Sequence, residues 1–413
     1  MSVRLPLIDT NVTSVTIVEN FTLVNNKNNQ KDNERRTALS GPAPKGDPGT
    51  AQVFGEWPAE HPLPLPEWGE RSAPVLRIPD GRSFRRLEED VEAALGKVLA
   101  TNNYNTIGNY IALYKGFKAS KCLNLFDYFQ MYTPPITPAH HTCVGLALEL
   151  WRNIAKNEPA MGEYFYLVSC EESIGAFEEY AGLQKEINET KNILEKEHVL
   201  LAMRFDLGGR DGIMLCDPGY HVGRAIIAMK DELAPHTGWF IQSKEPHLEK
   251  QFNYEYSKTN DDFVQWSERV TRNKAMVEEV HSLVYIRKPY LTAVDVTERR
   301  NLVYSFRSLL SRDRSGTLIA GIFFKVTEHN DEFLLFYQDE GKKRIKLNFS
   351  EFANLHHINE QIKPIIEKCN DQLNFAPGQL LSTLYVLYGI ANDKRYVQQL
   401  LDINTCINDI SED

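Results

Sequence analysis

Two apolar runs joined by a polar, glycine-rich turn form the clearest pattern of hydrophobic and polar positions in the chain. The runs cover residues 198–205 and 213–217, and the turn between them reads Asp-Leu-Gly-Gly-Arg-Asp-Gly. Gly-Gly and Asp-Gly pairs adopt the positive φ angles of tight turns, so this stretch predicts a β-hairpin. His198 opens the first strand, and Asp217 closes the second strand immediately before a Pro-Gly pair.

The pairing of this hairpin decides whether His198 and Asp217 can meet. If Leu207 pairs with Arg210, Leu200 lies opposite Asp217, and His198 is the diagonal neighbour of Asp217 on the same face. Diagonal neighbours lie about 7–8 Å apart, within reach of both side chains. A slip of one residue would put the two side chains on opposite faces. The pattern therefore permits a His–Asp pair without requiring one.

A helix with a buried face is predicted upstream of the hairpin. Its apolar positions are Ala147, Leu150, Trp151 and Ile154, which have helical spacing. Cys143 lies near the start of this helix, with Thr142 as the N-cap, unless the helix begins about a turn earlier at Thr137-Pro138. Either start places the thiol near the positive end of the helix dipole, which favours the thiolate.

The remaining periodic segments predict helices first and strands later. We expect helices over residues 84–100, 104–119 and 176–196, a connector over 123–132, and a buried strand over 164–169. Residues 221–233 read as a further strand and a turn. Short aromatic and β-branched runs predict strands at 251–257, 282–291, 302–310, 317–328, 332–338 and 344–349. These strands suggest an antiparallel sheet or small barrel that extends the hairpin, and helices at 357–373 and 378–401 end the pattern.

The N-terminal part of the chain has a different composition. Residues 12–24 can form a strand, but residues 25–79 are rich in Asn, Lys, Pro, Gly and Glu, which is typical of a disordered segment. We therefore expect a largely disordered segment over residues 1–80, a helical and hairpin-containing core over 81–240, and a β-rich part with C-terminal helices over 241–413. The fold class predicted is α+β.

Composition limits the kinds of partner. The 413 residues carry a net charge of −10, which argues against a general nucleic-acid or anionic-membrane surface. The six cysteines are widely spaced and show no metal-binding spacing, so we expect reduced thiols and no metal site. No apolar run is long enough for a signal peptide or a membrane helix. These features predict a cytoplasmic protein.

Cys143, His198 and Asp217 occur in an order that suits a catalytic triad. A thiolate, a base that carries its proton and a carboxylate that orients the base are the groups that acyl transfer through a thioester requires. The alternatives are a buried small cysteine, a strand-end histidine in solvent and an aspartate that only caps its own turn.

This order resembles the transglutaminase-like group of the papain superfamily, and the hairpin is most similar to that of arylamine N-acetyltransferases. The similar segments are HVLLAMRF and GIMLCDPGYHVG, within a match over about residues 100–240. Residues 139–142 replace the Arg-Gly-Gly that precedes the cysteine in the acetyltransferases. The resemblance implies a papain/transglutaminase-like core and substrate-pocket positions at Tyr220 and His221, and His141 is a further candidate for the acceptor pocket or oxyanion region.

The expected activity is cysteine-dependent acyl transfer with Cys143, His198 and Asp217. The resemblance implies acyl-CoA as a co-substrate, no permanently bound cofactor, and an amine as the acyl acceptor, either a small molecule or a peptide. The alternatives are a transglutaminase-like amide hydrolase or transamidase, and a catalytically inactive interaction scaffold on the same fold. The N-terminal segment offers a surface for a protein partner.

Overall fold

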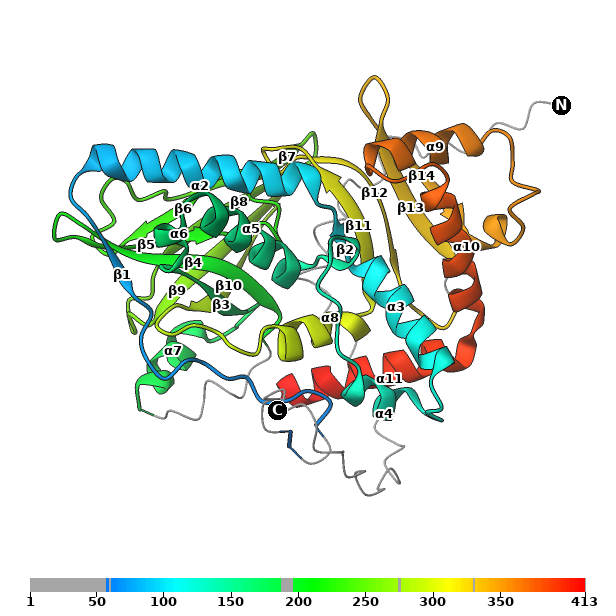
Figure 1. The fold of residues 1–413 in the computed structure, drawn as a ribbon, viewed down its shortest axis with the longest axis horizontal. Helices are drawn as coiled ribbons and strands as arrows, with labels where there is room; N and C mark the ends of the chain where they lie inside the picture. The colour runs from blue at the N-terminus through cyan, green and yellow to red at the C-terminus, as the bar shows by residue number, and fades with distance from the viewer. Residues whose placement is uncertain (1–56, 59–60, 187–195, 274–275, 330, 413) are drawn as a thin grey trace.

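Two β-sheets, with helices packed against both, make up the protein in a computed structural model (Figure 1). The structure describes residues 57–58, 61–186, 196–273, 276–329 and 331–412. The mixed α+β fold and the C-terminal helices are confirmed. The strand expected over residues 12–24 and most of the expected disordered segment lie outside the described residues.

The larger sheet contains nine strands in the order β6-β5-β4-β3-β10-β9-β8-β7, with β1 beside β4. The strands are β1 (Val75–Ile78), β3 (Phe165–Glu171), β4 (His198–Leu207), β5 (Asp211–Cys216), β6 (Ile226–Met229), β7 (Phe240–Glu245), β8 (Leu248–Tyr256), β9 (Phe263–Arg272) and β10 (Met276–Tyr285). All pairings are antiparallel except that of β1 with β4. The sheet curls into a half-barrel in which β6 contacts β8. It runs across residue 240, where a domain boundary was expected.

Part of the segment expected to be disordered is ordered. Within residues 61–80, β1 extends the larger sheet beside the second half of β4, with Val75 opposite Arg204. The indole of Trp68 packs edge-on against Tyr285, with 5.6 Å between the ring centres. Proline-rich composition predicts disorder, but the strand pairing and the contact of the half-buried Trp68 with Tyr285 hold these residues on the body of the protein.

The smaller sheet has the order β14-β13-β12-β11-β2. Its strands are β2 (Tyr104–Asn105), β11 (Phe306–Arg312), β12 (Leu318–Lys325), β13 (Glu332–Gln338) and β14 (Lys342–Asn348). The expectation that all later strands extend the hairpin sheet is therefore wrong for β11–β14. Strands β7 and β9 were not predicted, because charged residues interrupt their alternation of apolar and polar positions.

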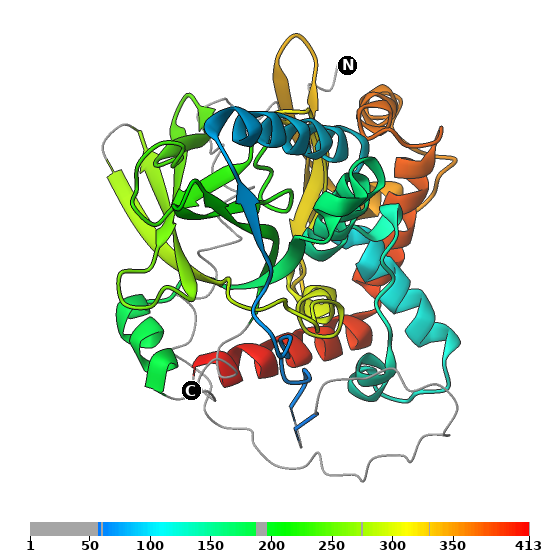
Figure 2. The ribbon, with the colours of Figure 1, turned by 60° about the vertical axis from the view of Figure 1, so that its left-hand side comes forward.

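Helices cover both sheets. They are α2 (Gly81–Thr101), α3 (Thr106–Ala119), α4 (Leu125–Met131), α5 (Cys143–Asn157), α6 (Pro159–Gly162), α7 (Phe177–Glu186), α8 (Arg299–Val303), α9 (Lys363–Gln372), α10 (Gln379–Asn392) and α11 (Lys394–Glu412). Short turns of helix are η2 (Pro138–His140), η4 (Val294–Glu298, a π-helix) and η5 (Phe349–Phe352). Figure 2 shows α11, in red, running beneath α8, and α11 contacts both α8 and α4.

Caps explain where two of these helices begin. Asp80 accepts hydrogen bonds from the backbone N–H groups of Arg82 and Ser83, each at 2.8 Å, and so starts α2. The single helix predicted over residues 378–401 is instead two helices, because Asp393 leaves the helical conformation and accepts a hydrogen bond from the N–H of Tyr396. The connector expected over residues 123–132 also contains a helix, α4.

The site lies where the two sheets meet through α5. One apolar core joins α2 and α5 to the larger sheet and reaches the smaller sheet through Leu310 and Phe336. A second core packs α3, α4 and the C-terminal helices on the smaller sheet. The N-terminus of α5 points toward η4 and α8, so residues from both sides of the molecule surround Cys143.

Candidate active site

The β4–β5 hairpin has the register that the sequence predicts. The N–H of Leu207 donates to the carbonyl of Arg210 at 2.9 Å, and Leu201 lies opposite Cys216. Continuing this register by one residue places Leu200 opposite Asp217, so His198 is the diagonal neighbour of Asp217. The turn therefore determines which face of the sheet carries the histidine and the aspartate.

Cys143 is the first residue of α5, as expected if Thr142 is the N-cap. The short helix η2 precedes it, so the alternative start at Thr137-Pro138 corresponds to a separate turn. The Thr142 side chain does not cap α5. Instead its hydroxyl donates to the buried carboxyl group of Glu298 in η4. The first-turn N–H groups beside Cys143 consequently do not donate a hydrogen bond to the N-cap side chain.

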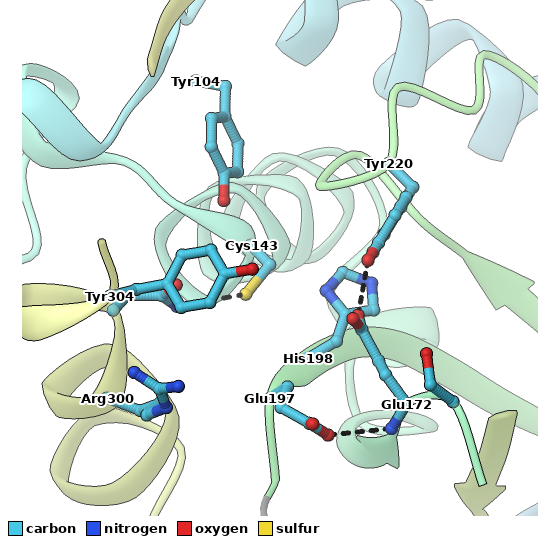
Figure 3. A pocket seen from close by; sticks show the side chains of 10 residues that line it. Tyr104, Cys143, Glu172, Glu197, His198, Tyr220, Arg300 and Tyr304 are labelled. Atoms are coloured by element: carbon cyan, nitrogen blue, oxygen red, sulfur yellow. Dashed lines mark hydrogen bonds between the residues drawn. The ribbon is translucent and has the colours of Figure 1, made fainter. Parts of the chain in front are cut away.

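Asp217 holds the imidazole of His198. The distance from His198 Nε2 to Asp217 Oδ1 is 2.9 Å, and the two side chains are 3% and 0% exposed. Asp217 also accepts a hydrogen bond from the N–H of Tyr220 at 2.9 Å and one from the hydroxyl of Tyr254 at 3.4 Å. Because Nε2 is paired with Asp217, Nδ1 is the ring nitrogen that faces Cys143 (Figure 3).

The surroundings of His198 favour its charged form. Burial lowers the pKa of His198, but the Asp217 charge, the hydrogen bond that His198 donates to Asp217, and the hydrogen bond and charge of Cys143 together hold that pKa well above its ordinary value. A charged imidazole between a carboxylate and a thiol can stabilise a thiolate and later deliver a proton.

Gly219 allows the thiol and the imidazole to approach each other. A Cβ atom at this position would lie 2.7 Å from Cys143 Cβ and 2.7 Å from His198 Cε1. Both distances are shorter than van der Waals contact, so a side chain here would push the two groups apart. The Pro-Gly pair that ends the hairpin thus has a role in packing at the site.

Cys143 and His198 lie in the wall of a pocket with about 610 Å³ of empty space, open solvent included (Figure 3). It is lined by Tyr104, Cys143, Glu172, Ser173, Glu197, His198, Tyr220, Arg300, Asn301 and Tyr304. The side-chain amide of Asn301 donates to the Cys143 sulfur at 3.9 Å. Chain segments from both sheets and from α8 therefore meet around one cysteine.

Two carboxyl groups lie on the histidine side of the pocket. The hydroxyl of Tyr220 donates to Glu172 at 2.6 Å, and the N–H of Glu172 donates to the carboxyl group of Glu197 at 2.8 Å. The Tyr220 ring stands edge-on to His198, with 4.6 Å between ring centres. Burial raises the pKa of Glu172 to about 7, although the His198 charge and the Tyr220 hydroxyl oppose this shift. Burial therefore makes Glu172 easier to protonate than an exposed glutamate.

Of the three expected substrate-binding residues, the structure brings Tyr220 to the pocket. The His221 side chain is instead paired with Arg312, whose guanidinium donates to Nδ1 of His221 at 3.0 Å. His141 is buried against Gly145, and burial lowers its pKa to about 4. Neither histidine is among the residues that line this pocket in the described part of the chain, and a role of either in substrate binding stays a prediction.

The other cysteines contrast with Cys143. All six are free thiols, as the sequence predicts. Cys170 and Cys216 are fully buried, and burial raises the pKa of each thiol. Cys143, although its side chain is buried, is the cysteine that lines the pocket. These surroundings single it out as the candidate nucleophile.

Sequence reasoning missed most of the pocket wall. Glu197 directly precedes His198, and Glu172 follows the predicted strand at 164–169, so their positions beside strand ends were available signals. Tyr104, Asn301 and Tyr304 come from segments far from the hairpin, and no local pattern marks them. Among the described residues, no group of three or more His, Cys, Asp or Glu side chains is placed to hold a metal ion.

Comparison with protein-family models, with curated proteins and with solved structures finds no match to this chain. None of the helices in the described ranges has the length and apolar character needed to cross a lipid bilayer.

Proposed function

We propose that the protein is a cysteine acyltransferase that works through a thioester on Cys143. The observation that carries the proposal is the position of the His198 imidazole, which hydrogen-bonds to the Asp217 carboxylate and faces the Cys143 thiol at the wall of a pocket. A buried cysteine with a purely structural role needs neither the histidine nor the opening to solvent.

The proposed reaction has two halves. In the first, the Cys143 thiolate attacks the carbonyl carbon of the acyl donor, and His198 gives a proton to the departing group as the thioester forms. In the second, His198 takes a proton from the acceptor as the acceptor attacks the thioester. Asp217 keeps the ring oriented and stabilises its charged form throughout.

The resemblance found in the sequence suggests the substrates. Arylamine N-acetyltransferases transfer an acetyl group from acetyl-CoA to an amine, so we propose an acyl-CoA donor and an amine acceptor, on a small molecule or a peptide. The cysteine at the start of a helix, the histidine at the start of one strand and the aspartate after the next support a papain/transglutaminase-like core.

Intact-protein and peptide mass spectrometry after incubation with acetyl-CoA tests the proposal. We expect one acetyl group on Cys143 of the wild-type protein, no such adduct in Cys143→Ala, and loss of the adduct when an amine acceptor is added. Asp206→Asn, at the far end of the same hairpin, is the matched control and should acylate like wild type.

The other outcomes separate the alternatives. Absence of an adduct on Cys143 with acetyl-CoA and with an activated ester would overturn acyl transfer in favour of a scaffold. An adduct formed from glutamine-containing peptides instead of acyl-CoA would assign the same three residues to amide hydrolysis or transamidation.

A further inference from the structure

Asn301 is an amide side chain held at the Cys143 sulfur by a segment remote from the hairpin. Its Nδ2 donates to Cys143 Sγ at 3.9 Å and to the carbonyl of Thr297, one turn earlier in its own helical segment, at 3.1 Å. The Asn301 side chain lines the pocket, so the same amide faces both the sulfur and the space where an acyl group bound to that sulfur would lie.

The turn that carries Asn301 is fixed by a buried cation. The Arg307 guanidinium donates to the backbone carbonyls of Asn301, at 2.6 Å, and of Leu302. Arg307 is fully buried beneath the Tyr110 ring, 4.8 Å from its centre. An amide held in this way requires little rearrangement during a reaction, which is the condition for effective electrostatic stabilisation.

The proposed reaction creates a negative charge that needs such a donor. When the Cys143 thiolate bonds to the acyl carbon, the electron pair of the C=O π bond moves to the oxygen and gives a tetrahedral oxyanion. When the bond to the leaving group breaks, that pair returns to reform the C=O bond, and His198 supplies the proton for the leaving group. The N–H of Cys143 is one candidate donor for the oxyanion, since the Thr142 side chain leaves the start of α5 uncapped.

We propose that Asn301 is the side-chain donor that stabilises this oxyanion. The inference rests on the proposed acyl transfer. The N–H that points to the sulfur can instead donate to an oxygen two bonds away from that sulfur, while the other N–H keeps its hydrogen bond to the Thr297 carbonyl. Useful donors lie about 2.7–3.1 Å from the oxyanion position. Tyr104 also points its hydroxyl toward Cys143 (Figure 3), and it serves as the comparison.

Two reactions of the same thiol test the assignment. Alkylation by iodoacetamide needs the thiolate but forms no oxyanion, whereas acylation by 4-nitrophenyl acetate or acetyl-CoA passes through one. For Asn301→Leu, which has similar size and no N–H donor, we expect acylation of Cys143 to slow about 100-fold or more. We expect its alkylation to stay within about threefold of wild type. Tyr104→Phe should slow acylation less, and Asn153→Leu, in the middle of α5, should change neither rate.

Each outcome decides a different question. Equal acylation rates for Asn301→Leu and wild type would overturn the role of Asn301 while leaving acyl transfer standing. Equal slowing of acylation and alkylation would show that Asn301 acts on the thiolate or on folding, which also overturns the assignment. A wild-type protein whose Cys143 is alkylated but never acylated would overturn both proposals.

Discussion

Replacing Asp217 by asparagine should remove the charge of His198 and with it the reactivity of Cys143 at acidic pH. The Asp217→Asn side chain keeps an oxygen that can accept the hydrogen bond from the Tyr220 N–H, so the loop after β5 should retain its conformation. The same oxygen, Oδ1, lies against the ring nitrogen and can still accept a hydrogen bond from it, but the negative charge of the carboxylate is gone. Burial then dominates the pKa of His198.

His141 indicates the size of the effect. It is a buried histidine of the same protein that forms no ion pair with a carboxylate among the described residues, and burial lowers its pKa to about 4. The pKa of His198 starts well above 6.5. A fall to the range of His141 exceeds two pKa units, which corresponds to about 3 kcal/mol in the stability of the imidazolium. The fraction of charged imidazole at pH 6 should therefore fall by about 100-fold.

The assay is the rate of iodoacetamide labelling of Cys143 between pH 5 and 9, measured by peptide mass spectrometry. Cys122→Ser and Cys406→Ser, which remove the two partly exposed thiols, provide a clean background. We expect wild type to label readily at pH 6, Asp217→Asn to label about 100-fold more slowly, and the difference to narrow toward pH 9. An Asp217→Asn variant that melts like wild type and labels at the wild-type rate at pH 6 would refute the reasoning.

Two further substitutions test the packing and the buried acid of the site. Gly219→Ala should lower the free energy of unfolding by about 1–3 kcal/mol and abolish acylation, because the new methyl group overlaps Cys143 and His198. The control is Gly389→Ala, in a helix with open space around this position, which should fold normally and react like wild type. An active Gly219→Ala variant would contradict the close approach of Cys143 and His198. Burial raises the pKa of Glu298 from 4.5 to about 8. Between these pH values the folded chain keeps a proton that the unfolded chain loses, so the free energy of unfolding of wild type should fall as the pH rises. For Glu298→Gln, the free energy of unfolding in urea should differ less between pH 5 and pH 8 than it does for wild type. An equal difference in the two proteins would show that Glu298 is ionised in the folded state.

The candidate catalytic residues could be found from the sequence because a hairpin is a local structure. The two glycines at residues 208–209 determine the turn, the turn determines the register, and the register brings His198 and Asp217 to one face. The helix start at Cys143 follows from Thr142 and the apolar spacing after it. Each of these inferences needs only neighbours in the sequence or one strand pairing.

The pocket wall could not be found in the same way. Asn301 and Tyr304 lie in and just after α8, and residues 302–310 read as a single strand in the sequence, although the first two of them end a helix. Val303 and its apolar neighbours satisfy both a helical and a strand pattern over so short a run. Tertiary contacts decide between the two patterns, among them the donation from the buried Arg307 to the carbonyls of Asn301 and Leu302.

The smaller sheet helps to hold the site in place, and this bears on what the protein acts on. A Cβ atom on Gly316, in the turn between β11 and β12, would lie 1.8 Å from the carbonyl oxygen of His221, so the backbone of this turn packs directly against the loop after Asp217. Tyr104, from β2 of the same sheet, lines the pocket. In the proposed reaction, the hairpin and the helix start would set the kind of chemistry, and the smaller sheet and α8 would set the shape that a substrate meets. Changes in the hairpin should consequently alter the rate with every acyl donor alike, and changes in Tyr104 or Tyr304 should alter the choice among donors and acceptors.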